Sequence, residues 1–279
     1  MSYVKNITLN FREKFNAFCV SDQIVNQATA DGCVPFIQLL NEDCIDLGGK
    51  FPNNAPFIGF LLGREKGFYS IDYNYAKAIV QSGINIRFLT YENVAEQMDG
   101  LCGLILPGGA FSSPDDFYAD GQKLYEPNTR YEAYETAVRT AEKQNMPILG
   151  ICAGAQMIAG LHGMHLWRDT QGKTQLQHKT KDVFAHVVYI RPNNMLRHLL
   201  KAEAVTTNSR HKEAVVPNLS SSDLQIYATA SDGIPEAWGN EEKNILCIQW
   251  HPEDFAANGV KKMQAIYDWL AQKAINFGK

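Results

Sequence analysis

Apolar and polar positions alternate along the chain in a way that predicts strands followed by helices. From residue 57 onward, short apolar runs typical of buried strands are followed by stretches in which apolar residues recur every three or four positions, as in helices. The predicted strands are 57–62, 84–89, 101–106, 147–151 and 244–248, and the predicted helices are 72–81, 92–97, 131–144, one starting after Cys152, and 260–275. This alternation predicts an α/β fold with a mainly parallel sheet covered by helices on both faces.

The pattern changes within this core and before it. Between residues 162 and 230 the segments become shorter and more polar, and 183–190 and 225–230 are predicted as antiparallel strands beside the main sheet. Residues 52–56, rich in proline and asparagine, resemble a connector. We therefore divide the chain into an N-terminal extension, 1–55, and one domain, 56–279. The extension would cover the site, mediate association or embellish the surface.

Composition and charge exclude several classes of function. The 279 residues are 45% hydrophobic and 20% charged, which is enough apolar material for a full core. The net charge of -4 is small and the basic residues are scattered, so nucleic acid is not an expected partner. No apolar run reaches the roughly 18 residues of a membrane span. Lys5 and Arg12 interrupt any secretory pattern, so a cytoplasmic location is expected.

The six cysteines are widely spread and include no C-x-x-C pair. Cys102 and Cys247 lie in strand-like apolar runs and are interpreted as core residues. Cys19, Cys33 and Cys44 fall in the N-terminal extension, where structural, exposed and redox-linked roles all stay open. This spacing does not favour zinc, and we expect neither a metal nor a cofactor.

One cysteine lies on a turn that favours reactivity. Residues 150–154 read Gly-Ile-Cys-Ala-Gly between the predicted strand and the helix. Glycines on both sides of Cys152 permit a tight turn, and the following helix directs its free N–H groups and positive end toward the sulfur. That environment favours thiolate, and the serine version of this turn is the nucleophile elbow of hydrolases. The alternative is a small buried cysteine without chemistry.

A base and a carboxylate follow about a hundred residues later. His251 and Glu253 come after the apolar run 244–248. Side chains two apart in an extended segment point the same way, so a hydrogen bond between them is expected if strand pairing continues past Trp250. Nucleophile, base and carboxylate need to meet only in space, so Cys152, His251 and Glu253 form a candidate triad.

Glycines at the end of the strand 101–106 suggest an oxyanion site. Pro107, Gly108 and Gly109 follow this strand directly. The backbone N–H of Gly109, with that of Ala153, is predicted to bind the oxyanion formed when a thiolate attacks a carbonyl. The alternative is an ordinary turn at the end of a strand. Both glycines and Cys152 fall at carboxyl ends of predicted parallel strands, where sites of such sheets form.

In combination, five motifs make the chain from about residue 57 resemble class I glutamine amidotransferase domains. Within them it is similar to the free-standing γ-glutamyl hydrolase branch, which includes γ-glutamyl-γ-aminobutyrate and folate γ-glutamyl hydrolases. The motifs are Leu-Pro-Gly-Gly at 106–109, Gly-Ile-Cys-Ala-Gly-Ala-Gln at 150–156, Asn-Ser-Arg-His at 208–211, Asp-Gly-Ile-Pro-Glu at 232–236 and Gln-Trp-His-Pro-Glu at 249–253. The resemblance implies a flavodoxin-like three-layer sandwich with a small antiparallel β addition.

The resemblance also implies roles for individual residues. Cys152 would be the nucleophile, His251 the base and acid, and Glu253 its partner, while Gln156 matches a position that contacts the γ-glutamyl part of the substrate. The hydrolase branch usually has a second histidine where this chain has Lys212, and often an arginine where it has Ala153. These differences leave the triad complete and concern the substrate.

Arg210 and His211 are further candidates for substrate binding. An arginine is suited to hold the α-carboxylate of a glutamyl group through paired hydrogen bonds, although a solvated loop charge is the alternative. Other polar residues have simpler interpretations. His178 and His186 match histidines of the hydrolase branch but are assigned to structural hydrogen bonding. Glu236 is assigned a structural role. His162 and His165 lack nearby carboxylates that a metal site needs.

The sequence therefore predicts a cysteine-dependent hydrolase of γ-glutamyl amides that works through a thioester. Its partner would be a small γ-glutamyl molecule, with no nucleic acid or membrane, and a homodimer is the common assembly for such domains. Two alternatives stay open: a glutaminase subunit that delivers ammonia to a synthetase, and a catalytically silent protein that binds γ-glutamyl ligands. The leaving amine is not readable from the sequence.

Overall fold

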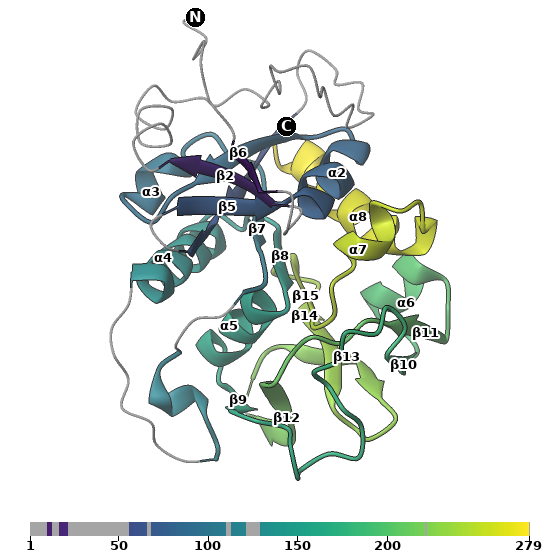
Figure 1. The fold of residues 1–279 in the computed structure, drawn as a ribbon. Helices are drawn as coiled ribbons and strands as arrows, with labels where there is room; N and C mark the ends of the chain where they lie inside the picture. The colour runs from purple at the N-terminus through teal and green to yellow at the C-terminus, as the bar shows by residue number, and fades with distance from the viewer. Residues whose placement is uncertain are drawn as a thin grey trace, which may run out of the picture.

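A nine-stranded sheet runs through the described part of the chain, and five neighbouring strands of it are parallel (Figure 1). The computed structural model describes residues 10–12, 17–21, 56–65, 68–109, 113–120, 129–220 and 222–278. The parallel strands, in spatial order, are β6 (Asn85–Leu89), β3 (Phe57–Leu61), β7 (Leu104–Leu106), β8 (Ile148–Ile151) and β15 (Ile245–Ile248). The predicted α/β class with a mainly parallel core is confirmed.

Four antiparallel strands extend the same sheet beyond β15. They are β14 (Pro235–Asn240), β13 (Gln225–Ala230), β10 (His186–Ile190) and β11 (Ala204–Thr207). The predicted antiparallel addition is therefore continuous with the parallel core. Strand β10 starts later than predicted, at His186, and the exposed residues Val183 and Phe184 lie outside it.

Helices cover both faces of the parallel strands (Figure 1). One face carries α2 (Tyr73–Gln81), α7 (Glu253–Ala256) and α8 (Lys261–Phe277), with α6 (Met195–Leu200) against α8. The other face carries α3 (Val94–Gln97), α4 (Thr129–Lys143) and α5 (Ala153–Leu161). Among the described residues, no helix combines the length and apolar character needed to cross a lipid bilayer.

Strand β8 is apolar throughout because both of its faces are buried. Successive side chains of a strand point to opposite faces, and both faces here are covered. Ile148 packs in the core on the α4 and α5 side, whereas Leu149 and Ile151 pack in the core on the α2 and α8 side. All three are fully buried, so the central strands tolerate no polar side chain on either face.

Smaller β elements surround this core. Strands β1 (Asn10–Arg12), β2 (Ala17–Ser21), β5 (Phe68–Asp72) and β4 (Gly63–Glu65) form one antiparallel sheet, and β9 (Met164–Trp167) pairs with β12 (Ala214–Ser220) in another. Residues 52–55 of the predicted connector and most of the predicted extension, including Cys33 and Cys44, lie outside the described residues. The division at residue 55 stays a prediction.

Asp72 caps helix α2 in a negative environment. Its carboxylate accepts the backbone N–H of Asn74 at 2.8 Å. Burial, and then the charges of Glu253 and Asp254 on the adjacent helix α7, raise the pKa of Asp72 to about 6 against the opposing effect of the Asn74 hydrogen bond. Folding therefore favours the protonated acid, and its contribution to stability is lost as pH rises from about 4 through 6.

The substitution Asp72→Asn tests this linkage. Asparagine is an equally good cap and stays neutral, so the variant should be more stable than the wild type at pH 8 by about 1–3 kcal/mol. Near pH 3 the two proteins should be almost equally stable, because aspartate is then mostly protonated in both states. Urea unfolding at the two pH values measures the difference. An equal gain at both would show that titration of Asp72 is not its cause.

Candidate active site

Cys152 occupies a strained turn between strand β8 and helix α5. Its backbone angles are φ 51° and ψ -111°, in the region that residues with a side chain rarely adopt. Such strain costs about 1–3 kcal/mol and persists only where the surroundings enforce it. The Cys152 N–H donates to the carbonyl of Ile248 on β15 at 2.8 Å, and helix α5 starts at the next residue. The predicted turn is present.

Two glycines are required at this turn because helix α5 packs too closely against strands β7 and β8 to leave room for a side chain. A Cβ on Gly154 would lie 2.1 Å from the carbonyl oxygen of Leu106 on β7. A Cβ on Gly150 would lie 2.7 Å from Ile158 and 2.9 Å from the Cα of Ala155, both on α5. These separations are far below van der Waals contact. Helix α5 can therefore begin directly beneath the strand ends only with glycine at both positions.

His251 and Glu253 form the predicted hydrogen bond by a different route. His251 Nδ1 lies 2.6 Å from Glu253 Oε1, and Glu253 is 2% exposed. The expectation of an extended segment was wrong, since β15 ends at Ile248 and Glu253 is the first residue of helix α7. The turn into the helix, not strand geometry, brings the two side chains together. The OH of Tyr267 lies 3.5 Å from the other carboxylate oxygen.

The imidazole of His251 meets the thiol of Cys152 next to Gly108. A Cβ built on Gly108 would lie 2.8 Å from His251 Cε1, 3.5 Å from His251 Nε2 and 3.2 Å from the Cβ of Cys152. Burial by itself lowers the pKa of His251. The charge of Glu253, and then the charge of and hydrogen bond with Cys152, outweigh burial and raise that pKa well above its usual range. The structure therefore brings the three predicted residues together.

Asn208 fixes the backbone of His251, which the sequence did not reveal. Its side-chain oxygen accepts the N–H of His251 at 2.8 Å, and its side-chain nitrogen donates to the carbonyl of His251 at 3.1 Å. The same nitrogen also donates to Asp254 at 3.0 Å. Asn208 belongs to a motif of the resembled family, but only the fold shows that it clamps the histidine.

The glycine turn after β7 is held from two helices. Gly108 N–H donates to the OH of Tyr75 on α2 at 3.1 Å, and Arg130 on α4 donates to the carbonyl of Gly108 at 3.0 Å. Gly109 has φ 128°, where glycine is favoured, and a Cβ there would meet the Arg130 guanidinium at 2.8 Å. No sequence pattern marks Tyr75 or Arg130, because each resembles an ordinary helix residue.

The predicted oxyanion donors directly follow Cys152 and Gly108 in the chain. Ala153 is the first residue of helix α5, so its N–H is among those that the helix itself cannot bond. Gly109 is exposed at the end of the fixed turn. Their role in binding an oxyanion stays a prediction.

The three predicted substrate residues have different surroundings. Gln156 is buried, and its side-chain nitrogen donates to the carbonyl of Glu213 at 2.7 Å and to Gln249 at 3.1 Å. His211 is also buried, and its Nδ1 lies 2.8 Å from the same Glu213 carbonyl. Arg210 is 45% exposed and pairs with Asp254 at 2.6 Å. Substrate contact by these residues stays a prediction.

Comparison with known proteins supports the interpretation of the fold and motifs. The family model for Peptidase C26 matches residues 64–253. The chain belongs to the Peptidase C26 family. It is thereby a member of the class I glutamine amidotransferase-like superfamily, and the family indicates hydrolase chemistry. This match covers the candidate nucleophile, base and carboxylate together.

Individual relatives agree with this membership. The glutamine amidotransferase-like protein YvdE of Lactococcus lactis is 31% identical over 58% of this chain and 70% of its own length. The gamma-glutamyl-CDP-amidate hydrolase of Campylobacter jejuni is 24% identical over 73% of this chain and 76% of its own length. A solved structure from Thermoplasma acidophilum, described as part of a GMP synthase, shares the fold, with TM-score 0.57 and 18% identity over 80% of this chain and 96% of its own.

The close contact at Gly154 predicts a strong steric effect. Gly154→Ala should lower the free energy of unfolding by about 3 kcal/mol or more, because the new methyl group meets a backbone carbonyl of a central strand. Gly100→Ala is the control: its φ of 70° is strained for alanine, but its surroundings are open. That variant should lose only about 1 kcal/mol. Urea unfolding compares the two, and equal losses would contradict the steric explanation.

Proposed function

We propose that this chain hydrolyses γ-glutamyl amide bonds through a γ-glutamyl thioester on Cys152. One observation carries the proposal: His251 contacts Glu253 through one ring nitrogen and lies beside Cys152 on the strained turn. This arrangement can activate a sulfur nucleophile and then return a proton to a leaving group. The Campylobacter relative is named for hydrolysis of a γ-glutamyl amidate, which supports the substrate class.

The first half of the proposed reaction forms the thioester. The Cys152 sulfur, paired with protonated His251, attacks the amide carbonyl of the γ-glutamyl group, and the carbonyl π electrons move onto oxygen. Backbone N–H groups of Gly109 and Ala153 stabilise this oxyanion. The C–N bond then breaks as His251 donates its proton to the departing amine. Glu253 keeps the imidazole oriented throughout and balances its charge.

The second half releases glutamate. Neutral His251 accepts a proton from water as the water oxygen attacks the thioester carbonyl. The C–S bond breaks, the sulfur leaves as thiolate, and the protonated imidazole pairs with it again. No outside oxidant or energy source is required, because the net reaction is amide plus water giving acid plus amine. The proposed substrate is a small molecule, and the proposed location of the protein is the cytoplasm.

Arg210 is the proposed contact for the α-carboxylate of the substrate. Its side chain is the most exposed of the three predicted substrate residues, and it already pairs with a carboxylate, Asp254. A substrate carboxylate would therefore share or replace that ion pair. Gln156 and His211 support this region by holding the backbone carbonyl of Glu213 from two sides.

A glutaminase that delivers ammonia to a synthetase is the second candidate, favoured by the amidotransferase-like relative from Lactococcus. The two candidates differ in dependence on a partner. Hydrolysis of γ-glutamyl amides by the isolated chain supports the free-standing hydrolase. Glutamine hydrolysis only after a synthetase is added supports the second candidate.

Substitution of the nucleophile is the direct test. Cys152→Ala should abolish glutamate release from a panel of γ-glutamyl amides while the protein stays folded by circular dichroism. Glu253→Gln should retain the histidine but lower kcat by about 10²–10⁴-fold, since the imidazole loses its orienting carboxylate. Cys102→Ala, a partly buried cysteine on the edge of the core, is the matched control and should keep wild-type activity.

Covalent labelling separates an enzyme from a silent binding protein. A diazo-ketone analogue of glutamine should modify Cys152, detected by peptide mass spectrometry, and should leave Cys102 unmodified. Turnover by the Cys152→Ala variant would refute the proposed chemistry. Absence of both labelling and hydrolysis in the wild type would instead favour the silent binding protein.

A further inference from the structure

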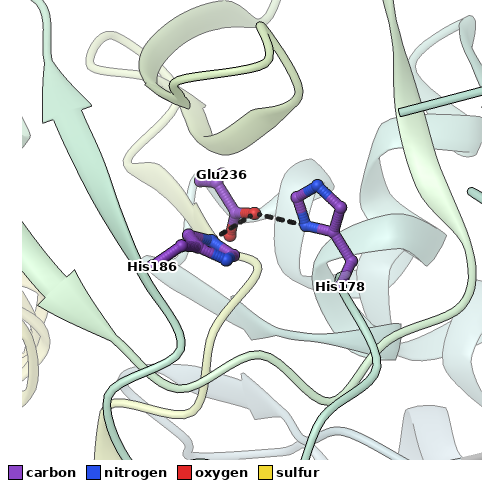
Figure 2. Close-up of side chains that lie close together, drawn as sticks. All are labelled: His178, His186 and Glu236. Carbon is purple, nitrogen blue, oxygen red and sulfur yellow. Dashed lines mark hydrogen bonds and ion pairs between the residues drawn. The ribbon is translucent and has the colours of Figure 1, made fainter. Parts of the chain in front are cut away.

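A second cluster of titratable side chains lies in the antiparallel half of the molecule. It contains His178, in the segment before β10, His186 at the start of β10, and Glu236 on β14. Figure 2 shows the two imidazole rings approaching the carboxylate from different segments of the chain. All three residues are buried, with exposed fractions of 1%, 8% and 0%. The proposed hydrolysis does not use this cluster.

The spacing of its atoms suits a metal ion. His186 Nε2 lies 3.2 Å from Glu236 Oε1, and His178 Nδ1 lies 3.3 Å from the same oxygen. One candidate ligand atom from each of the three residues lies within 4.8 Å of the others. A tetrahedral Zn²⁺ with bonds of about 2.0–2.1 Å holds its ligand atoms roughly 3.3 Å apart. Both histidine–carboxylate separations already have roughly this spacing.

Hydrogen bonds outside the cluster leave ring nitrogens directed into it. His178 Nε2 lies 3.0 Å from Asp232 Oδ2, so this nitrogen carries the proton that the carboxylate accepts. Glu236 Oε2 is buried and has no hydrogen-bond partner among the described residues, and His178 Nδ1, which also meets no hydrogen-bond criterion there, lies 3.3 Å from Glu236 Oε1. A histidine that donates one N–H to a carboxylate and directs its other nitrogen inward has the arrangement of a zinc ligand.

Charge balance points the same way. Glu236 and Asp232 are both buried, with side chains 0% and 2% exposed. In the described part of the chain, the ion-pair partners of these carboxylates are histidines, namely His178, His186 and His211. One divalent cation bound between them would balance two buried negative charges.

We propose that His178, His186 and Glu236 bind one divalent transition metal ion, with Zn²⁺ the expected ion. Two imidazoles and a carboxylate form a known zinc ligand set, and Asp232 orients His178 from outside. His211 lies at the edge of the site, with Nε2 3.5 Å from Glu236 Oε1 and Nδ1 held by the Glu213 carbonyl. The spacing of the cysteines predicted no metal. The ligands proposed here are histidines and a glutamate from separate segments, so no local sequence pattern marks them.

The proposed metal would stabilise the segment that holds His251. The carbonyl of His178 accepts the Ser209 hydroxyl at 2.7 Å and the His211 N–H at 3.0 Å. Ser209 follows Asn208, whose side chain bonds both backbone groups of His251. The ion is therefore assigned a structural role: it joins β10, β14 and the His178 segment into a support for the candidate active site.

Metal analysis of the whole protein tests the site. Protein produced with added Zn²⁺ and desalted without chelator should contain about one zinc per chain, as measured by inductively coupled plasma mass spectrometry. His186→Gln and Glu236→Gln should each remove most of it. His162→Gln is the matched control, because His162 is also held by two carboxylates, Glu142 and Asp223, at 2.8 and 2.7 Å. That variant should retain its zinc even if it is less stable.

A second measurement does not depend on the variants folding. Wild-type protein stripped with a chelator should regain about 5 °C or more in Tm when Zn²⁺ is restored, because the ion binds the folded state. Co²⁺ added to the stripped protein should give the visible absorption of a tetrahedral site with nitrogen and oxygen ligands. Substoichiometric metal in the wild type, with no change in Tm on adding Zn²⁺, would overturn the proposal. Equal zinc loss in His162→Gln would also overturn it.

Discussion

The candidate active site depends on one close approach, that of helix α5 to strand β7 at Gly154. The backbone of the helix passes so near the carbonyl of Leu106 that no side chain fits between them. This contact sets where α5 begins, and the beginning of α5 forces Cys152 into its strained conformation. The strain is maintained because β7 and β8 are central strands whose side chains are fully buried on both faces. A single packing constraint thus presents the sulfur at the ends of the parallel strands.

The parallel and antiparallel halves of the sheet contribute different parts of the site. The parallel half supplies the Cys152 turn and the glycine turn after β7, the latter held by Tyr75 and Arg130 from helices on opposite faces. The antiparallel half supplies support: Asn208, which follows β11, bonds both backbone groups of His251, and the neighbouring Ser209 and His211 bond the carbonyl of the buried His178. The imidazole lies where these halves meet, so its position depends on contacts between residues far apart in the sequence.

Sequence patterns predicted the features that are local in the chain. Apolar runs and helical spacing identified the parallel core, and the glycines around Cys152 identified the turn, because each depends on neighbouring residues. The pairing of His251 with Glu253 was predicted for the wrong reason, since the segment turns into helix α7 and is not extended. Contacts across the fold had no local pattern. Asn208 bonds a backbone 43 residues away, and Glu236 meets His186 from 50 residues away, so only the folded chain reveals them.

The electrostatics around His251 explain how a buried imidazole can stay charged. Burial favours its neutral form, but the charges of Glu253 and Cys152 and the hydrogen bonds with both residues together outweigh burial, and Glu253 Oε1 lies 2.6 Å from the imidazole. Burial, and then the charge of Glu253, raises the pKa of both Tyr75 and Tyr267 well above their usual range, so these phenols remain neutral and add no negative charge beside it. Two neighbours therefore stabilise the positive charge of the imidazole: the carboxylate of Glu253 and the sulfur of Cys152.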